Sequence, residues 1–386
     1  MKKIAICRFT PYDVNFDSYN VQELGMAKAF CRRGFDVDII AFKSRDHSQR
    51  VLYQSGLNKV NCIEVPRIHI LRWGYNATIL NESYWRPYDI IVCFEYMQIM
   101  CYKVAKLTRK VILYSGPYYN LFFLKIDSPL YDLATVRTYN KTLLANFTKS
   151  VLAQKYLEKK GYNKVTTLGV GLDLDKFSST ITMSDQTKEI VEFMSNNDCL
   201  LYVGALSERK NYPFMLEVFK EVLKIKPNVK FVLIGRSCTS KIKRMLGQKD
   251  ENYAKRYFER MTSDVKEGIF HIERVDNSQL QFIYPLAKAF LLPSKLEIFG
   301  MVLLEALYLG APVITSRNGG SMTLIDKRNT GVIINEFDSK KWCDAVLRYL
   351  NDQAFREEVC KNGRKLIEQE FTWDYIVANM LKSLTH

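Results

Sequence analysis

Residues 289–315 alternate between two apolar patterns, and this alternation restricts the fold more than any other part of the sequence. Ala289–Pro293 is a short apolar run typical of a buried strand, and Met301–Leu309 has the pattern of a helix that Gly310 ends. Ala311–Thr315 is the next predicted strand. Strand, helix and strand in this order make a βαβ unit, in which ligands bind at the loops leaving the carboxyl ends of the strands. The loop 294–300 is therefore the first candidate site.

The same alternation runs through both halves of the chain. In the first half we predict strands at 3–7, 36–42, 61–67, 89–94, 110–114 and 165–168, and helices at 21–33, before 107, at 130–147 and at 150–160. In the second half we predict strands at 199–203, 229–234, 271–275, 289–293, 311–315 and 331–334, and helices at 212–226, 239–266, 277–286, 301–309, 340–351, 353–370 and 373–384. Alternating strands and helices favour parallel sheets.

A chain of 386 residues is too long for one ordinary core, so we expect two domains. The segment 178–185 is rich in Ser and Thr and is the best linker candidate. The predicted fold class is α/β, with two doubly wound, Rossmann-like domains facing a cleft. Their predicted bounds are 1–180 and 181–370, and residues 371–386 form a closing helix that crosses back to the first domain.

The charge is uneven along the chain. The net charge is +15, and residues 1–180 contribute +11 of it, with 26 Lys and Arg against 15 Asp and Glu. Such a half can meet phospholipid head groups, a phosphate-bearing lipid substrate or nucleic acid, and the equally weighted alternative is an ordinary solvated surface. The aromatic loop 117–125, flanked by basic charge, fits either a membrane contact or core packing.

Nine cysteines without a C-x-x-C pair indicate buried free thiols in a reducing compartment. No apolar run reaches the length of a membrane span, and the apolar run of residues 1–8 ends at Arg8, too early for a signal peptide. We expect a cytoplasmic protein, with peripheral contact at the inner face of the membrane as the alternative.

The chemistry of the candidate site follows from residue types. A helix that begins at Gly300 presents amide groups and its positive dipole end to an anion such as a diphosphate. Arg209 and Lys210, in a loop after another predicted strand, can neutralise that diphosphate. Glu305 in the helix body suits ribose hydroxyls, and Glu297 would lie nearer the reacting group. For each residue taken singly, a surface role is the more common explanation.

The run Pro-Ser-x-x-Glu-x-Phe-Gly-x-x-x-x-Glu-Ala-x-x-x-Gly-x-Pro-Val-Ile, from Pro293 to Ile314, resembles the signature of the retaining glycosyltransferases of family four, which have the GT-B fold. The similarity extends through residues 204–211, 229–235, 318–320 and 371–373, and covers most of 150–386, but the first half only in layout.

The resemblance implies a retaining, metal-independent hexosyltransferase (EC 2.4) that moves a sugar from a nucleotide-diphosphate sugar to a glycan or lipid-linked acceptor, in cell-surface polysaccharide or glycolipid synthesis. The second domain would bind the donor and the first the acceptor, and no cofactor or nucleic acid is expected. The alternatives are a non-catalytic nucleotide-sugar-binding protein and another GT-B enzyme such as a sugar-nucleotide epimerase.

The resemblance also assigns roles. The catalytic candidates are Glu297, Lys210 and Arg209, with Glu297 on the donor-sugar hydroxyls and Lys210 on the phosphates. The donor-binding candidates are Glu305 (ribose), Gly300 and Met301 (diphosphate amides), Gly235 (base pocket), Val302, Phe299 and Gly204. The acceptor-side candidates are Asn20, Ser115, Gly116 and Tyr118.

The sequence departs from the family pattern in several places. Many members have Arg where this chain has Ala205, and an acidic residue where it has Thr323. A Gly-Gly pair near Asn20 is missing, and Tyr114-Ser-Gly replaces a frequent histidine. Asp173-x-Asp175 has the spacing of a metal site, but it follows a domain-exit turn, so we expect no metal there.

Overall fold

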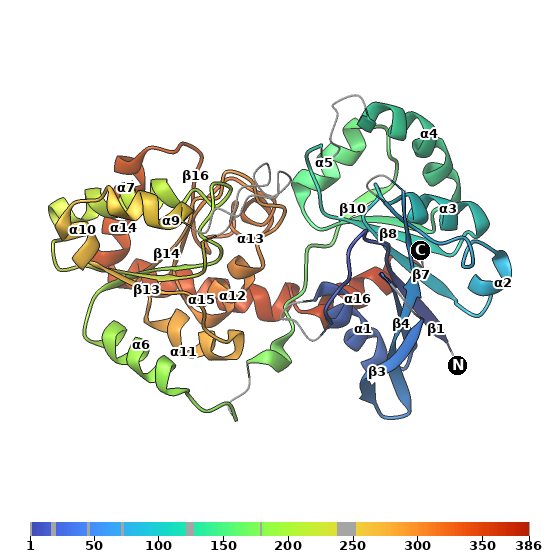
Figure 1. Cartoon of the computed structure of the whole chain (residues 1–386), viewed down its shortest axis with the longest axis horizontal. Coiled ribbons are helices and arrows are strands. Elements are labelled where there is room, and N and C mark those ends of the chain that lie inside the picture. The colour runs from blue at the N-terminus through green and yellow to red at the C-terminus, as the bar shows by residue number, and fades with distance from the viewer. Residues whose placement is uncertain are drawn as a thin grey trace. The chain divides into compact units, whose positions relative to one another are not determined.

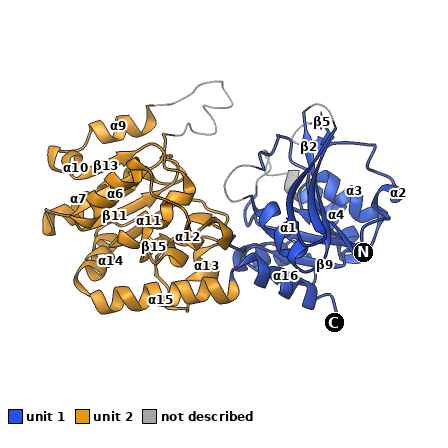
Figure 2. Ribbon diagram, turned by 90° about the horizontal axis from the view of Figure 1, so that it is seen from below, with its two compact units in different colours: residues 1–173, 371–386 blue, residues 174–370 orange. Residues whose placement is uncertain are grey.

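The computed structural model describes residues 2–16, 21–44, 47–70, 73–120, 127–177, 180–237 and 252–385 (Figure 1). The chain divides into two compact units, one of residues 1–173 with 371–386 and one of residues 174–370 (Figure 2). This division falls slightly before the linker predicted at 178–185, and it assigns the last segment to the first unit.

Within the described residues, the strands of unit 1 form an eight-stranded sheet in the order β10-β9-β8-β7-β1-β2-β4-β3, plus a small β5-β6 ribbon. The strands are β1 Lys3–Arg8, β2 Asp36–Lys43, β3 Ser48–Ser55, β4 Asn58–Pro66, β5 Ile68–Ile70, β6 Trp73–Tyr75, β7 Ile90–Phe94, β8 Val111–Ser115, β9 Ala145–Thr148 and β10 Val165–Thr167. The helices are α1 Gln22–Arg32, α2 Glu82–Trp85, α3 Ile99–Leu107, α4 Asp127–Thr142, α5 Val151–Lys159 and α16 Trp373–Lys382. In the large sheet every neighbouring pair is parallel except β3 and β4.

The described strands of unit 2 form a parallel six-stranded sheet in the order β13-β12-β11-β14-β15-β16. They are β11 Cys199–Val203, β12 Lys230–Ile234, β13 Ile269–Ile272, β14 Ala289–Leu292, β15 Val313–Ser316 and β16 Val332–Ile334. The α-helices are α6 Asp185–Ser195, α7 Tyr212–Ile225, α9 Tyr253–Glu259, α10 Ser263–Glu267, α11 Leu280–Ile283, α12 Met301–Leu309, α13 Ser321–Leu324, α14 Ser339–Asn351 and α15 Gln353–Glu370. Short 3-10 turns occupy Leu174–Lys176, Asn277–Gln279 and Tyr284–Leu286.

Both sheets are covered by helices on their two faces (Figure 1), and two central strands of the unit 2 sheet are apolar throughout. All residues of β11, Cys199–Val203, and of β14, Ala289–Leu292, are buried. Continuous apolar strands are typical of parallel sheets, because crossover helices shield both faces from water. The predicted α/β class with two doubly wound sheets is therefore correct.

Two predicted elements are wrong in their bounds. The helix expected over 130–147 ends at Thr142, and Ala145–Thr148 pairs with β8 instead, which buries Phe147. A short apolar run fits the periodicity of a helix as well as that of a strand, and pairing with a neighbouring strand decides between the two. The strand expected at 271–275 is Ile269–Ile272, because it pairs with β12 only as far as Ile234. Of the helical region expected at 239–266, residues 238–251 lie outside the described part of the chain.

No helix in the described part of the chain has the length and hydropathy needed to cross a bilayer.

The last helix, α16, packs on unit 1 through Trp373. A Cβ atom added to Gly25 of α1 would lie 2.2 Å from Trp373 Nε1, so the indole packs directly on the helix backbone. Asp374 accepts hydrogen bonds from Arg32 Nη2 at 2.6 Å and from Arg33 Nη1 at 2.8 Å. Leu172 N donates to Phe371 O at 2.7 Å, so the chain on both sides of unit 2 is joined at this point.

Trp373→Ala is expected to lower the free energy of unfolding of unit 1 by about 3–5 kcal/mol, because it leaves a large cavity against α1. Tyr375→Ala on the same helix removes a side chain that is 41% exposed and should change stability by less than about 0.5 kcal/mol. Denaturant unfolding of both variants checks this, and equal effects would contradict the packing role of Trp373.

Candidate active site

The loop predicted as the site leaves β14 at the carboxyl edge of the unit 2 sheet and ends at Gly300, the N-cap of α12. Gly300 has φ +82°, the left-handed conformation that glycine adopts without steric cost. A Cβ here would approach Glu297 Cγ to 3.1 Å. Met301 and Val302, the first helical residues, are partly exposed. The positive end of the α12 dipole therefore lies beside the loop that carries Glu297.

Glu297 forms ion pairs with two cations from the loop between β11 and α7. Lys210 Nζ donates to Glu297 Oε2, and Arg209 Nη1 donates to the same oxygen at 3.0 Å. The side chains of Lys210 and Glu297 are 9% and 12% exposed, whereas that of Arg209 is 50% exposed. The structure thus brings together the three residues predicted as catalytic, although 87 positions separate Lys210 from Glu297.

Backbone hydrogen bonds hold the two loops in register. Lys295 N donates to Arg209 O at 2.9 Å, and Arg209 Nη1 also donates to Leu296 O at 2.9 Å. These contacts position the carboxylate and the two cations on one frame. A preorganised arrangement of this kind needs little rearrangement when an anionic ligand binds.

Glu297 is a carboxylate at neutral pH. Burial alone would raise its pKa, but the charges of Lys210 and Arg209 and their hydrogen bonds outweigh burial and leave the pKa below its ordinary value. An ionised carboxylate accepts hydrogen bonds from hydroxyl groups, and the ammonium and guanidinium groups have further N–H donors for an incoming phosphate.

Glu305 lies in the second turn of α12 and is only 2% exposed. Its Oε2 is 3.4 Å from the hydroxyl of Tyr284. The second predicted carboxylate is thus a buried group of the helix body, unlike Glu297, which belongs to the loop.

At two places on this edge of the sheet, one loop approaches the backbone of another so closely that only glycine fits. A Cβ on Gly235 would lie 1.8 Å from Gly204 O, and a Cβ on Gly320 would lie 1.8 Å from Phe299 O. Gly204 and Gly235 therefore let the ends of β11 and β12 meet, and Gly320 lets the next loop pack on Phe299, which is buried. Any side chain at Gly235 or Gly320 would displace the site's backbone.

The loop after β15 is held by a hydrogen-bond network around Asn318. Its side chain donates to Ser316 O at 2.9 Å and accepts from Ser321 N at 2.9 Å, while Ser316 Oγ donates to Ser294 O at 2.6 Å. The network joins the ends of β14 and β15, and Thr323, where the family often has an acidic residue, donates to Gly319 O instead.

The acceptor-side candidates lie in unit 1. Ser115 ends β8, and its hydroxyl accepts from Tyr96 N at 2.9 Å, whereas Gly116 N donates to Glu95 Oε2 at 3.0 Å. Tyr118 is partly exposed and packs edge to face on Tyr119. Asn20 lies outside the described residues.

The structure also reveals charged residues that the sequence analysis missed. Glu95, directly after β7, has φ +70° and forms an ion pair with Lys149, which follows β9, at 2.6 Å. Arg8, at the end of β1, pairs with Glu23 of α1. The signal was available, since Arg8, Glu95 and Lys149 each stand at the end of a strand, where parallel sheets carry their ligand sites.

Asp173 and Asp175 lie in different units of the chain. Asp173 forms an ion pair with Lys28 of unit 1 at 2.9 Å, and Asp175 lies in the 3-10 turn Leu174–Lys176 of unit 2. Over the described ranges, no group of three or more His, Cys, Asp or Glu is arranged to hold a metal ion.

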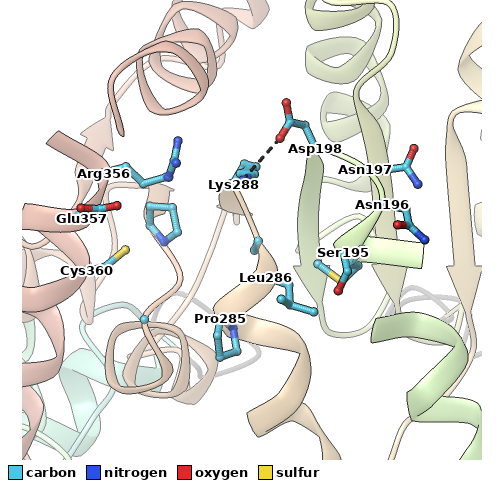
Figure 3. Close-up of a pocket in the computed structure, with 14 residues that line it drawn as sticks. Ser195, Asn196, Asn197, Asp198, Pro285, Leu286, Lys288, Arg356, Glu357 and Cys360 are labelled. Carbon is cyan, nitrogen blue, oxygen red and sulfur yellow. Dashed lines mark ion pairs between the residues drawn. The ribbon is translucent and has the colours of Figure 1, made fainter. Parts of the chain in front are cut away.

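A pocket of about 600 Å³ lies at the opposite edge of the unit 2 sheet (Figure 3). Asp198, Lys288 and Pro312, which line it, precede β11, β14 and β15, and Arg356 comes from α15. Lys288 and Asp198 approach to 3.5 Å. Because these residues stand at the amino ends of the strands, the length of the sheet separates this pocket from Glu297.

Comparisons with known proteins agree with the fold. Residues 183–366 match the family model described as glycosyl transferases group 1. The chain is 24% identical to an uncharacterized glycosyltransferase of Methanocaldococcus jannaschii over 91% of this chain and 90% of that protein. It is 26% identical to the capsular polysaccharide biosynthesis glycosyltransferase CapM of Staphylococcus aureus over 54% of this chain and 52% of that protein. The crystal structure of Anabaena HepE in complex with UDP-glucose superposes with a TM-score of 0.69 at 15% identity, covering 100% of both chains.

Glu297→Gln is expected to lower stability by about 3 kcal/mol at neutral pH, because it leaves the buried Lys210 without its counter-charge. Since the folded pKa of Glu297 is lowered, its contribution is present above the unfolded pKa of about 4.3 and is lost as pH falls through the folded value. The difference in unfolding midpoint between wild type and variant should therefore shrink below about pH 4. The measurement is thermal unfolding of both proteins between about pH 3 and pH 7, in steps of about one pH unit.

The control is Glu273→Gln, which removes an exposed carboxylate of the same unit and should change little at any pH. A difference for Glu297→Gln that stays constant from neutral to acid pH would contradict the ion-pair explanation.

Proposed function

Because the chain is a glycosyltransferase of the family-four type with the GT-B fold, we propose that it transfers a sugar from a nucleotide-diphosphate sugar to a glycan or lipid-linked acceptor with retention of configuration. The observation that carries the proposal is the Glu297 carboxylate, held by Lys210 and Arg209 beside the glycine that begins α12. Anabaena HepE, which shares the fold, has been crystallised with UDP and with UDP-glucose.

The first role of the site is to stabilise the leaving diphosphate. Cleavage of the bond between sugar and phosphate leaves negative charge on the diphosphate, and cations together with a helix N-terminus stabilise that charge where it develops. Lys210 and Arg209 provide two positive charges, and the start of α12 provides the dipole. In this proposal no protein group forms a covalent bond to the sugar.

The second role is to orient the donor sugar. Glu297 is ionised and fixed by two cations, so it can accept hydrogen bonds from sugar hydroxyls without reorganising. With the sugar held in this way, the acceptor hydroxyl attacks from the face that the diphosphate leaves, and a diphosphate oxygen takes the proton. This sequence yields retention.

The remaining donor contacts follow the predicted roles. Glu305 would bind the ribose, and its burial in α12 makes it a rigid acceptor. Gly235, which follows β12, would line the base pocket, and Gly204 would lie beside it. The similarity to a capsular polysaccharide biosynthesis glycosyltransferase supports a role in surface polysaccharide or glycolipid synthesis.

The test is a panel of nucleotide sugars scored for binding by calorimetry and for slow donor hydrolysis. Glu297→Ala is expected to reduce kcat for hydrolysis by about two orders of magnitude, because the sugar is no longer oriented. Lys210→Ala should weaken UDP binding as well as turnover, since it contacts the phosphates in the bound state. Product anomers assigned by NMR would establish retention.

Lys288→Ala, in the pocket at the other edge of the same sheet, is the matched control and should leave both readouts unchanged. Donor binding without turnover for any sugar, even with acceptor extracts, would favour a non-catalytic binding protein. A product with an inverted sugar stereocentre still attached to the nucleotide would indicate an epimerase.

Excess chelator is expected to leave turnover unchanged, because Lys210, Arg209 and the start of α12 supply the positive charge that the diphosphate needs. The measurement is donor hydrolysis with and without EDTA, followed by addition of Mg²⁺ or Mn²⁺. If EDTA abolishes donor hydrolysis and either ion restores it, metal independence is wrong, and Asp175 becomes a candidate metal ligand.

A further inference from the structure

Most of the net charge of the protein lies in one part of unit 1. Residues 99–164, from the start of α3 to the residue before β10, contain twelve Lys and Arg against three Asp and Glu, which is +9 of the total of +15. Lys106, Arg109, Arg137 and Lys141 are among the exposed cations of this part. In Figure 1 α3, α4 and α5 lie next to one another in unit 1. The excess charge is thus shared between these helices and the segments that connect them.

The outer side of α4 combines exposed leucines with cations. Leu130, Leu133, Arg137 and Lys141 are spaced by three and four residues, so they follow one face of the helix, which we call the α4 face. Leu130 is 61% exposed and Leu133 is 82% exposed. No carboxylate of the described residues lies within ion-pair distance of Arg137 or Lys141. Two large apolar side chains on one exposed helical turn are unfavourable in water unless a partner covers them.

Two recesses beside α4 show how the cations are grouped. One, of about 600 Å³, is lined by Arg137 and Lys141 together with Lys106 and Arg109, and Glu82 also contributes to its lining. This recess gathers cations from α3, from the turn after it and from α4 around a single carboxylate.

The other recess, of about 790 Å³, is lined by Leu133, Val136 and Arg137 with Lys160 of the adjacent helix end. Here Lys160 forms an ion pair with Asp132. Apolar and cationic side chains therefore lie side by side along the same helix.

We propose that the α4 face docks the protein on an anionic lipid bilayer, with the two leucines entering the interface and the cations lying against head-group phosphates. The arrangement fits a bilayer better than a soluble polyanion, because a bilayer accepts both the apolar and the cationic side chains. Arginine and lysine carry their charge at the end of a long apolar stem, so they can reach phosphates while the helix lies in the interface. This proposal goes beyond the transfer reaction and does not depend on it.

The experiment is flotation of the full-length protein with vesicles of phosphatidylcholine alone or mixed with phosphatidylglycerol. Binding is expected only to the anionic vesicles, and it should weaken as salt is raised, because salt screens surface charges. Wild-type protein that does not float with anionic vesicles at low salt would overturn the proposal.

Variants locate the surface. Arg137→Gln with Lys141→Gln should weaken partitioning roughly 30-fold, at about fivefold for each charge near an anionic surface. Leu130→Ser with Leu133→Ser should weaken it about tenfold or more, because the apolar insertion is lost. All four side chains are exposed in the folded protein, so thermal midpoints and donor hydrolysis should stay at wild-type values.

The matched control is Lys361→Gln with Lys365→Gln, which removes two exposed charges at the same spacing from α15 of unit 2 and should not change vesicle binding. An equal loss for this pair would show unspecific charge attraction and overturn the assignment to α4. If the leucine variant binds anionic vesicles as the wild type does, and heparin displaces the protein from them completely, the surface binds an anionic polymer and not a membrane.

Discussion

The ion pair between Glu297 and Lys210 is the interaction on which the site in unit 2 depends. It places a carboxylate and an amine, both largely withdrawn from water, at the carboxyl edge of a parallel sheet. Burying two charges is unfavourable unless each has partners, and here Arg209 and backbone contacts between the two loops supply them. Desolvated charge pairs that shift the pKa values of their members cluster at functional sites.

Close approach of backbone to backbone is the second constraint. Gly235 lies against the carbonyl of Gly204, and Gly320 lies against the carbonyl of Phe299, so these two positions have no room for a side chain. Together with the left-handed Gly300, these positions let loops from four strands converge on one edge. The sheet therefore acts as a rigid base, and the chemistry resides in the loops above its strands.

Unit 1 repeats this architecture with different chemistry at its edge. Glu95 and Lys149 form an ion pair after the ends of strands, as Glu297 and Lys210 do in unit 2. Glu95 also has a positive φ that a non-glycine residue rarely adopts. Unit 1 carries +11 of the net charge of +15, so most of the positive charge lies there and not in unit 2. The two units thus share a fold class while they differ in what their surfaces can bind.

The sequence by itself determined the fold class, because apolar runs of strand and helix period alternate through both halves and a buried parallel sheet is the arrangement that satisfies them. It also determined the candidate residues around Gly300, since glycine, carboxylate and cation types carry their chemistry with them. It did not determine where the helix after 130 ends or that Ala145–Thr148 is a strand, because that depends on pairing with β8. Only the tertiary structure decided that Lys210 meets Glu297, that Gly235 faces Gly204, and that leucines of α4 remain exposed, since each is a contact or an absence of contact between segments distant in the chain.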